Sequence, residues 1–506
     1  METMGKKSFL NALSALGMTL TNGLLGIVVT RMVILRFGSD FNGLNSTANQ
    51  IVNVLLILEG GFSLASNVAL FRPLSEGNYD KVNSLLASTA DKFHKIGLLF
   101  LLCGLGVAAA YTFFVNSALP KELIFSLLLM TVFPAAVNLY FAVTYRVLLQ
   151  AQQREYVINF IMTLSIACGH LGNMVMIRAG GPMWAVRAIT MSCSLSSSLA
   201  IVLYVRRKNR RVRFTRETPR AAIRGTGDVM VQKITSVIYA SAPIIFLSVS
   251  PAGGTALASV YAVYNNVFVM AKSLMHALID APRLSLGFLI AKQKREEVWR
   301  VFRQYEYVSF LAIFAAFSTA FAQILPFIRL YTRDVADVNY LDGAIALLMS
   351  AIVTLEMLHI PSGHLINMAG EFRVSRNFQL TACVSLLLLM VLGGSMRGIY
   401  GMLGAVLATA VLLAVLEIGF VHTRFFPKRL GEFFSMLFPV ALTGIALGAF
   451  EARLSVPQNG YIVFFLQCAA LLALNSGALL LVAFATQRET TYFLWRRIRR
   501  LLKSER

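Results

Sequence analysis

The chain has 506 residues, of which 57% are hydrophobic and only 14% are charged, and its mean hydropathy is +0.68. This composition excludes an ordinary soluble domain and is typical of a membrane protein with many spanning helices. The net charge of +22 does not indicate a nucleic-acid partner, because the basic residues lie between apolar runs and not on an aromatic-interleaved platform.

Apolar runs of about 20 residues, long enough to cross a membrane, recur along the whole sequence. The first follows METMGKKSFL without a cleavage site, so we predict a spanning helix there and not a signal peptide. The sequence therefore predicts an all-α polytopic membrane protein with 14 transmembrane helices. They lie at roughly 9–35, 44–70, 93–115, 121–147, 156–177, 183–205, 228–250, 255–281, 306–328, 341–366, 376–396, 400–423, 431–450 and 460–486.

The loops on the side of the N-terminus hold most of the 46 Lys and Arg residues. Since positively charged loops stay in the cytoplasm, both termini are predicted to be cytoplasmic. The densest basic segments are 206–224, 292–303 and 496–506. They either fix the topology alone or also contact anionic lipid head groups.

The sequence repeats itself: Asn49-Gln50-Ile51-Val52 recurs in the second half of the chain as Asn265-Asn266-Val267-Phe268. The first match has an offset of 216 residues, and LLQAQQREYVIN (148–159) matches LINMAGEFRVSRN (365–377) at nearly the same offset. We therefore predict a duplication into two six-helix lobes of the same orientation, as in many transporters. The predicted parts are an N-lobe (1–205), a basic linker (206–227), a C-lobe (228–423), and two further helices with a basic tail (424–506).

The predicted second span carries a polar stripe. As one helix, it places six polar residues within an arc of about 120°: Asn45, Asn49, Asn53, Glu59, Ser63 and Asn67. Glu59 lies about 22 Å along this helix from Leu44, too deep for its side chain to reach either surface. The stripe either lines a wet cleft or forms hydrogen bonds between packed helices.

The predicted eighth span is the repeat partner of the second. Asn265, Lys272, His276 and Asp280 share one face of it. Lys272 either faces a cleft or extends to the cytoplasmic surface, and Asp280 either belongs to the cleft or pairs with Arg283 at the boundary.

Other ionisable residues also fall within predicted spans. Arg31 either reaches the outer interface or faces the cleft, where its guanidinium group would hold a phosphate. Glu356 lies one helical turn from His359 and two from His364, an arrangement that favours either a proton relay or a structural pair.

Several kinds of chemistry are not indicated. The sequence contains no P-loop, HExxH or CxxC motif, and its five cysteines all lie in apolar runs. We therefore expect no cofactor and no metal site, and an ATP-driven process would require a separate subunit.

The segment 36–86 carries a set of motifs: Gly38, then Asn42-Gly43, then Glu59-Gly60, then Phe71-Arg72-Pro73-Leu74. With LLQAQQREY (148–156), these motifs resemble the multidrug/oligosaccharidyl-lipid/polysaccharide (MOP) exporter superfamily, in particular its Wzx-type flippases. The resemblance implies two six-helix lobes arranged as a V, as in MATE transporters, plus two C-terminal helices.

The resemblance also implies a function. An isoprenoid-diphosphate-linked oligosaccharide would cross the bacterial inner membrane by alternating access, with an H⁺ or Na⁺ counter-ion and glycan-assembly partners. Arg31 and Lys272 would contact the diphosphate. Substrate binding would fall to Arg31, Asn45, Asn49, Asn53, Asn265, Lys272 and His276, and coupling to Glu59, Asp280, Glu356 and His359.

Two other functions remain open. One is a cation-coupled multidrug antiporter of MATE type. The other is a membrane glycan polymerase or ligase, which the sequence disfavours because the longest external connection, 329–340, is short. We expect a transporter and not an enzyme.

Overall fold

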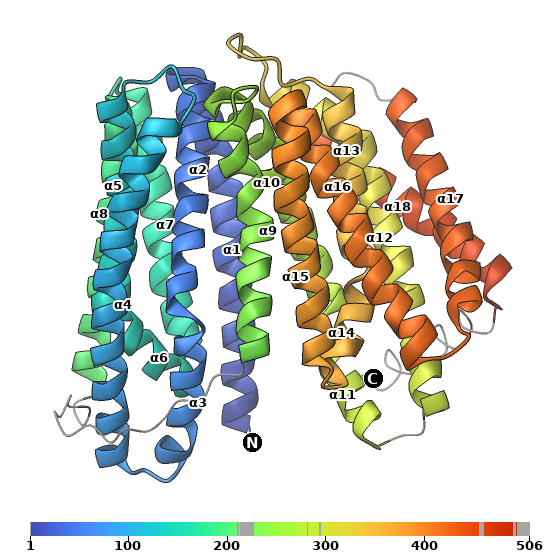
Figure 1. Cartoon of the computed structure of the whole chain (residues 1–506), viewed down its shortest axis with the longest axis horizontal. Helices are drawn as coiled ribbons and strands as arrows, with labels where there is room; N and C mark the ends of the chain where they lie inside the picture. Colours follow the sequence, from blue (N-terminus) through green and yellow to red (C-terminus); the bar gives the residue numbers. More distant parts are fainter. Residues whose placement is uncertain are drawn as a thin grey trace. The chain divides into compact units, whose positions relative to one another are not determined.

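The computed structural model describes residues 2–209, 212, 227–280, 282–292, 295–454, 460–488 and 492. Within these ranges every regular element is helical (Figure 1). Most of the basic segment 206–224 and all of 496–506 lie outside the described residues. The all-α fold predicted from composition is confirmed.

The described residues contain eleven helices long and apolar enough to cross a membrane, or twelve if the bent pair Ser39–Glu59 and Phe62–Ser75 forms one span. One of the eleven, Phe372–Phe425, includes two predicted spans that meet at Gly398, where φ is 56°. The helix Thr255–Ile279, which carries Lys272, is not among the eleven. The prediction of 14 spans thus agrees approximately with the structure, and the chain is a multi-pass membrane protein.

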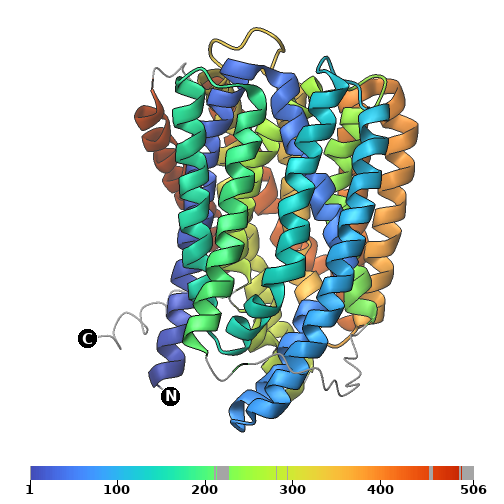
Figure 2. The same cartoon turned by 90° about the vertical axis from the view of Figure 1, so that its left-hand side faces the viewer.

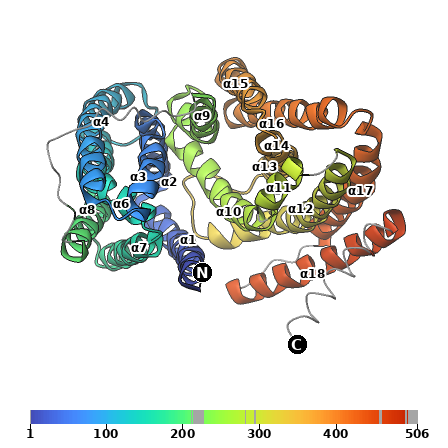
Figure 3. The same cartoon turned by 90° about the horizontal axis from the view of Figure 1, so that it is seen from below.

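The chain divides into two compact units, Met1–Val260 and Tyr261–Arg506. In the first unit, Figure 2 shows α4 to α8 running alongside one another, and Figure 3 shows α1, α7 and α8 side by side. Its elements are α1 (Glu2–Phe37), α2 (Ser39–Leu55), the 3₁₀-helix η1 (Leu56–Glu59), α3 (Phe62–Ser75), α4 (Tyr79–Phe114), α5 (Lys121–Val137), the π-helix η2 (Asn138–Ala142), α6 (Val143–Ala151), α7 (Glu155–Arg178), α8 (Met183–Lys208) and α9 (Gly227–Val249).

In the second unit, α17 and α18 pack along α12, where Phe310 and Phe314 meet Phe433 and Leu479. Its elements are α10 (Thr255–Ile279, beginning in the first unit), α11 (Arg283–Lys292), α12 (Arg295–Tyr331), α13 (Gly343–Leu358), α14 (Ile360–Met368), α15 (Phe372–Leu389), the π-helix η3 (Met390–Gly394), α16 (Ser395–Phe420), the π-helix η4 (Val421–Phe425), α17 (Leu430–Leu454) and α18 (Tyr461–Thr486).

The two units repeat the same internal packing. In the first, α3 contacts α6, α4 contacts α5, and α7 contacts α8; in the second, α11 contacts α14, α12 contacts α13, and α15 contacts α16. The helix starts repeat as well, because Thr255 of α10 follows Ser39 of α2 by the same offset as Arg295 of α12 follows Tyr79 of α4. The division into lobes at 205 and 228 stays a prediction.

The second span differs from its prediction. We expected one continuous helix over 44–70, but α2 ends at Leu55, and η1 leads into Gly60 and Gly61, whose φ angles are 58° and 73°. Two consecutive left-handed residues end the helix, and α3 continues at a bend of 48°. The prediction of a single straight stripe was therefore wrong beyond η1.

α2 is held by its apolar face and by one close contact. It buries Phe41, Leu44, Ala48, Ile51 and Leu55 at three- or four-residue spacing. Near its start, Asn42 Nδ2 donates to Ser259 Oγ at 2.7 Å, and the Thr255 hydroxyl donates to Asp40. A Cβ atom added at Gly43 would lie only 1.7 Å from the carbonyl oxygen of Thr255.

We predict that Gly43→Ala lowers the stability of the first unit by about 1–3 kcal/mol, because the backbone of Thr255 must move. Gly17→Ala in α1 is the control, since an added Cβ meets nothing within 4 Å there. Thermal unfolding in detergent measures both. Equal melting temperatures for the two variants would contradict the close contact.

Candidate functional site

In the first unit, two asparagines of the predicted stripe bind a buried arginine. Arg187 on α8 is 6% exposed. Its Nη1 donates to Asn49 Oδ1 at 3.0 Å, and its Nη2 donates to the backbone carbonyl of Asn45. Among the described residues, no carboxylate pairs with Arg187, so its positive charge is balanced only by neutral dipoles. Sequence reasoning assigned no role to Arg187, because its partners lie 138 and 142 positions away along the chain.

The remaining part of the stripe connects to α9. Asn53 is exposed, and its Nδ2 donates to Gln50 Oε1 at 3.1 Å. The same Gln50 oxygen accepts a hydrogen bond from Ser241 Oγ at 2.9 Å. The Oδ1 atom of Asn45 is buried and has no hydrogen-bond partner within the described part of the chain. The amides therefore join α2 to α8 and α9, and the Asn45 Oδ1 atom remains able to accept a hydrogen bond.

Glu59 and Arg31 lie elsewhere in this unit. Glu59 ends η1, directly before the glycine pair, and is half-buried. Its charge interacts with that of Arg146 on α6, whose Nη1 donates to Asn138 Oδ1 at 3.4 Å. Arg31 is half-buried on α1. Arg31, Arg146 and Arg187 therefore all lie on membrane-spanning helices of the first unit.

In the second unit, Lys272 and Glu356 form an ion pair. The Lys272 Nζ atom of α10 lies 2.9 Å from Glu356 Oε2 of α13, and the two side chains are 25% and 16% exposed. Lys272 is about 25 Å along α10 from Thr255. Glu356 lies within the candidate span Gly343–Met368, where an unpaired charge is costly, and the pair offsets that cost while remaining partly accessible.

A second pair lies one turn further along. His359, between α13 and α14, has its Nδ1 atom 2.9 Å from Glu417 Oε2 of α16. The side chains are 13% and 3% exposed. Gly363 permits this contact, because an added Cβ would lie 2.7 Å from the same Glu417 oxygen. Glu417 had no role in the sequence-based hypothesis.

A third group surrounds Asp280 at the end of α10. Its Oδ1 atom lies 3.3 Å from His364 Nε2 and 3.6 Å from His276 Nδ1. On the other side of the ring, His364 Nδ1 lies 3.0 Å from the hydroxyl of Tyr305. Asn265 is half-buried on the same helix, about two turns before Lys272.

Glu356, His359 and His364 therefore each have a partner on a different helix, and they form no single chain of contacts with one another. The α13–α14 segment instead carries three separate acid–base pairs. The proton relay through these residues, one of the two roles expected from the sequence, stays a prediction. Among the residues with described coordinates, no three His, Cys, Asp or Glu side chains are grouped to hold a metal ion.

Sequence reasoning missed one buried pair. Glu306 of α12 and His422 of η4 are both 0% exposed, and His422 Nε2 lies 3.1 Å from Glu306 Oε2. The rings of Trp299, Phe302 and Phe433 surround the imidazole. Both residues stand at the ends of predicted spans, 306–328 and 400–423, and the sequence-based prediction gave them no role. No signal in the sequence marks this pair, because its members are 116 positions apart; in the structure His422 lies in the π-helical turn η4, a local distortion frequent at functional positions.

No family model and no curated protein sequence matches the chain. Solved structures do. A structure described as lipid II flippase MurJ in an inward closed conformation superposes with a TM-score of 0.70 at 13% identity, over 94% of this chain and 99% of that one. An inward-facing multidrug resistance MATE family transporter of the MOP superfamily gives 0.66 at 13% identity, over 82% and 98% of the chains. The chain has a MATE/MurJ-like fold.

A further structure, of the MATE multidrug transporter DinF-BH, gives a TM-score of 0.57 at 15% identity, over 83% and 96% of the chains. At these identities the likeness establishes the fold alone. The prediction of that fold from the sequence is confirmed, whereas the Wzx-type assignment stays a prediction.

We predict that Glu306→Ala destabilises the second unit by about 3–5 kcal/mol, because His422 then stays buried without its partner. Glu296→Ala is the matched control on the same helix, since the Glu296 side chain is 77% exposed in its pair with Arg429. The melting temperature of the purified protein distinguishes them. A Glu306→Ala protein as stable as the control would show that the buried pair adds nothing.

Proposed function

We propose that the chain is a flippase for an isoprenoid-diphosphate-linked oligosaccharide in a bacterial inner membrane, with both termini in the cytoplasm. The observation that carries the proposal is the Lys272–Glu356 pair, a partly exposed cation held by an acid of the candidate span Gly343–Met368. The fold supports it, because a flippase for a lipid-linked precursor superposes on nearly the whole chain.

The substrate has three parts, and each requires a different kind of residue. The lipid tail requires an apolar surface, and the diphosphate requires cations, for which Arg31 and Lys272 are the proposed contacts. Arg187 adds positive potential, since no carboxylate among the described residues neutralises it. The sugars require hydrogen-bonding groups, and the residues proposed to supply them are Asn45, Asn49, Asn53, Asn265 and His276.

The ion pair also gives a physical route to coupling. A diphosphate that binds Lys272 displaces Glu356, and an unpaired carboxylate at this depth takes up a proton. Release of the substrate lets the pair form again and frees the proton, so in this scheme the proton travels with the substrate and not as the counter-ion of the sequence-based hypothesis. Glu59, Asp280, Glu356 and His359 are the proposed coupling residues, and a ligand with unequal affinity for the two states shifts the inward–outward equilibrium.

We predict that Lys272→Ala lowers glycan export about 10- to 100-fold, since a charge-assisted hydrogen bond contributes roughly 1.5–3 kcal/mol. Glu356→Gln keeps the shape of the partner but cannot exchange a proton, so export falls and its pH dependence is lost. Cells that lack their own flippase, complemented with each variant, provide the measurement.

The control is Arg72→Ala, which removes an exposed cation paired with Glu76 on the surface of α3. Its export stays at the wild-type level. If Lys272→Ala and Glu356→Gln both export glycan as the wild type does, the pair has no part in transport.

The alternative is a cation-coupled multidrug antiporter. The two MATE structures favour it, since one is described as a multidrug resistance transporter and the other as a multidrug transporter. An antiporter would confer resistance to cationic dyes in cells without the glycan genes, whereas the flippase would not.

A membrane polymerase or ligase has less support. The connection between α12 and α13, residues 332–342, is short. It offers little room for an external catalytic domain.

A further inference from the structure

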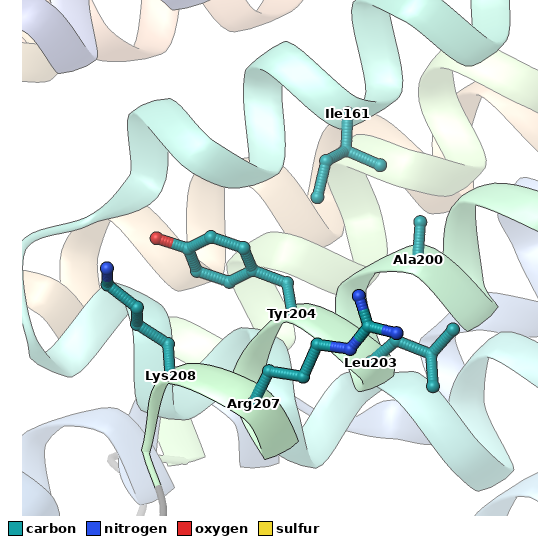
Figure 4. Close-up of a pocket in the computed structure, with 6 residues that line it drawn as sticks. All are labelled: Ile161, Ala200, Leu203, Tyr204, Arg207 and Lys208. Atoms are coloured by element: carbon teal, nitrogen blue, oxygen red, sulfur yellow. The ribbon is translucent and has the colours of Figure 1, made fainter.

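The transport proposal does not use the basic end of α8. A groove of about 340 Å³ lies between α7 and α8 in the first unit, where α8 ends (Figure 4). Its lining residues are Ile161, Ala200, Leu203, Tyr204, Arg207 and Lys208.

The groove changes character along its length. Ala200 and Leu203 of α8, with Ile161 of α7, form an apolar part, while Arg207 and Lys208 stand in the last turn of the helix. Ala200 and Lys208 are about 12 Å apart along the axis. In Figure 4, the Tyr204 hydroxyl and the Lys208 nitrogen point to one side of the view, and the Arg207 guanidinium group points to the other side, toward Leu203. An apolar wall that leads to cations over this distance matches the upper acyl chain and the phosphate of a phospholipid.

The apolar part faces the surroundings of the protein. Leu203 and the neighbouring Leu199 are 44% and 59% exposed on a helix that spans the membrane. Such a surface is compatible with lipid tails, which are as apolar as leucine itself. The groove is thus open to membrane lipid.

The two cations of the groove have no acidic partner within the described part of the chain. Arg206, the third basic residue of this turn, is already engaged, because its Nε donates to the Tyr145 hydroxyl at 3.1 Å. Arg207 and Lys208 are exposed, and neither forms an ion pair with a described residue. Basic residues at a helix C-terminus are favoured by the helix dipole and by topology. Neither effect requires a groove beside them.

We propose that this groove binds an anionic phospholipid. Its phosphate group lies beside Lys208 and accepts a hydrogen bond from Tyr204, Arg207 adds positive charge from the Leu203 side of the groove, and one acyl chain follows Leu203, Ala200 and Ile161. Basic pockets between spanning helices on the cytoplasmic side hold anionic head groups in this way. The predicted orientation places the lipid in the cytoplasmic leaflet.

Native mass spectrometry of the full-length protein tests the proposal, with phosphatidylglycerol and phosphatidylcholine of the same acyl chains as probes. We expect the wild type to retain phosphatidylglycerol preferentially. The Arg207→Gln/Lys208→Gln variant is expected to bind it roughly 30-fold more weakly. This factor corresponds to a loss of about 1 kcal/mol of binding free energy for each of the two basic residues. Arg206→Gln is the control, since it removes one positive charge from the same helical turn and keeps the groove, so its binding falls far less than that of the double variant.

A second variant separates a lipid from a free anion. Ala200→Trp fills the apolar part while all three cations remain, and it is expected to lose phosphatidylglycerol. Equal retention by the double variant and by Arg206→Gln would overturn the proposal. Displacement of phosphatidylglycerol by inorganic phosphate, or by an isoprenoid diphosphate at equal concentration, would also overturn it, because the groove would then be a phosphate site or a substrate entry site.

Discussion

A charged side chain in the apolar part of a membrane must have a partner, because it cannot be solvated there. This constraint explains most of the polar architecture of the second unit. Lys272 has Glu356, His359 has Glu417, His364 has Asp280, and Glu306 has His422. Each pair joins two different helices, so the same contacts that neutralise the charges also fix the helices relative to one another. A change in the charge of one member therefore alters helix packing, which is what a coupled transporter requires.

The first unit meets the constraint differently. Among the described residues, its buried Arg187 has the Asn49 amide and the Asn45 carbonyl as hydrogen-bond acceptors and no carboxylate, so its charge is hydrogen-bonded but not neutralised. A neutral partner leaves the positive potential available to an anion, whereas a carboxylate would cancel it. The difference between the units is consistent with a division of labour in the proposed mechanism. In the proposed mechanism the arginines of the first unit would add positive potential for the diphosphate that Lys272 also contacts, and three of the four proposed coupling residues lie in the second unit.

Local regularities were predictable from the sequence, and long-range partners were not. The four-residue spacing of Asn45 and Asn49 follows from the helical period, and composition alone led to the all-helical membrane fold. The sequence repeat also predicts the helix starts, because α10 and α12 begin at the repeat offset after α2 and α4. By contrast, the break at Gly60 and Gly61 depends on two left-handed residues that apolar periodicity does not reveal. The Glu306–His422 pair joins residues 116 positions apart, and no spacing rule brings them together.

The most direct test of the central claim is transport by the purified protein in vesicles. A fluorescent isoprenoid-diphosphate oligosaccharide is placed in both leaflets, and a membrane-impermeant quencher reports how much of it reaches the outer one. The account predicts that a pH gradient drives net movement across the bilayer with the wild-type protein and not with Glu356→Gln. Movement no faster than in protein-free vesicles, in a preparation that expels a cationic dye, would contradict the flippase account and favour the multidrug antiporter.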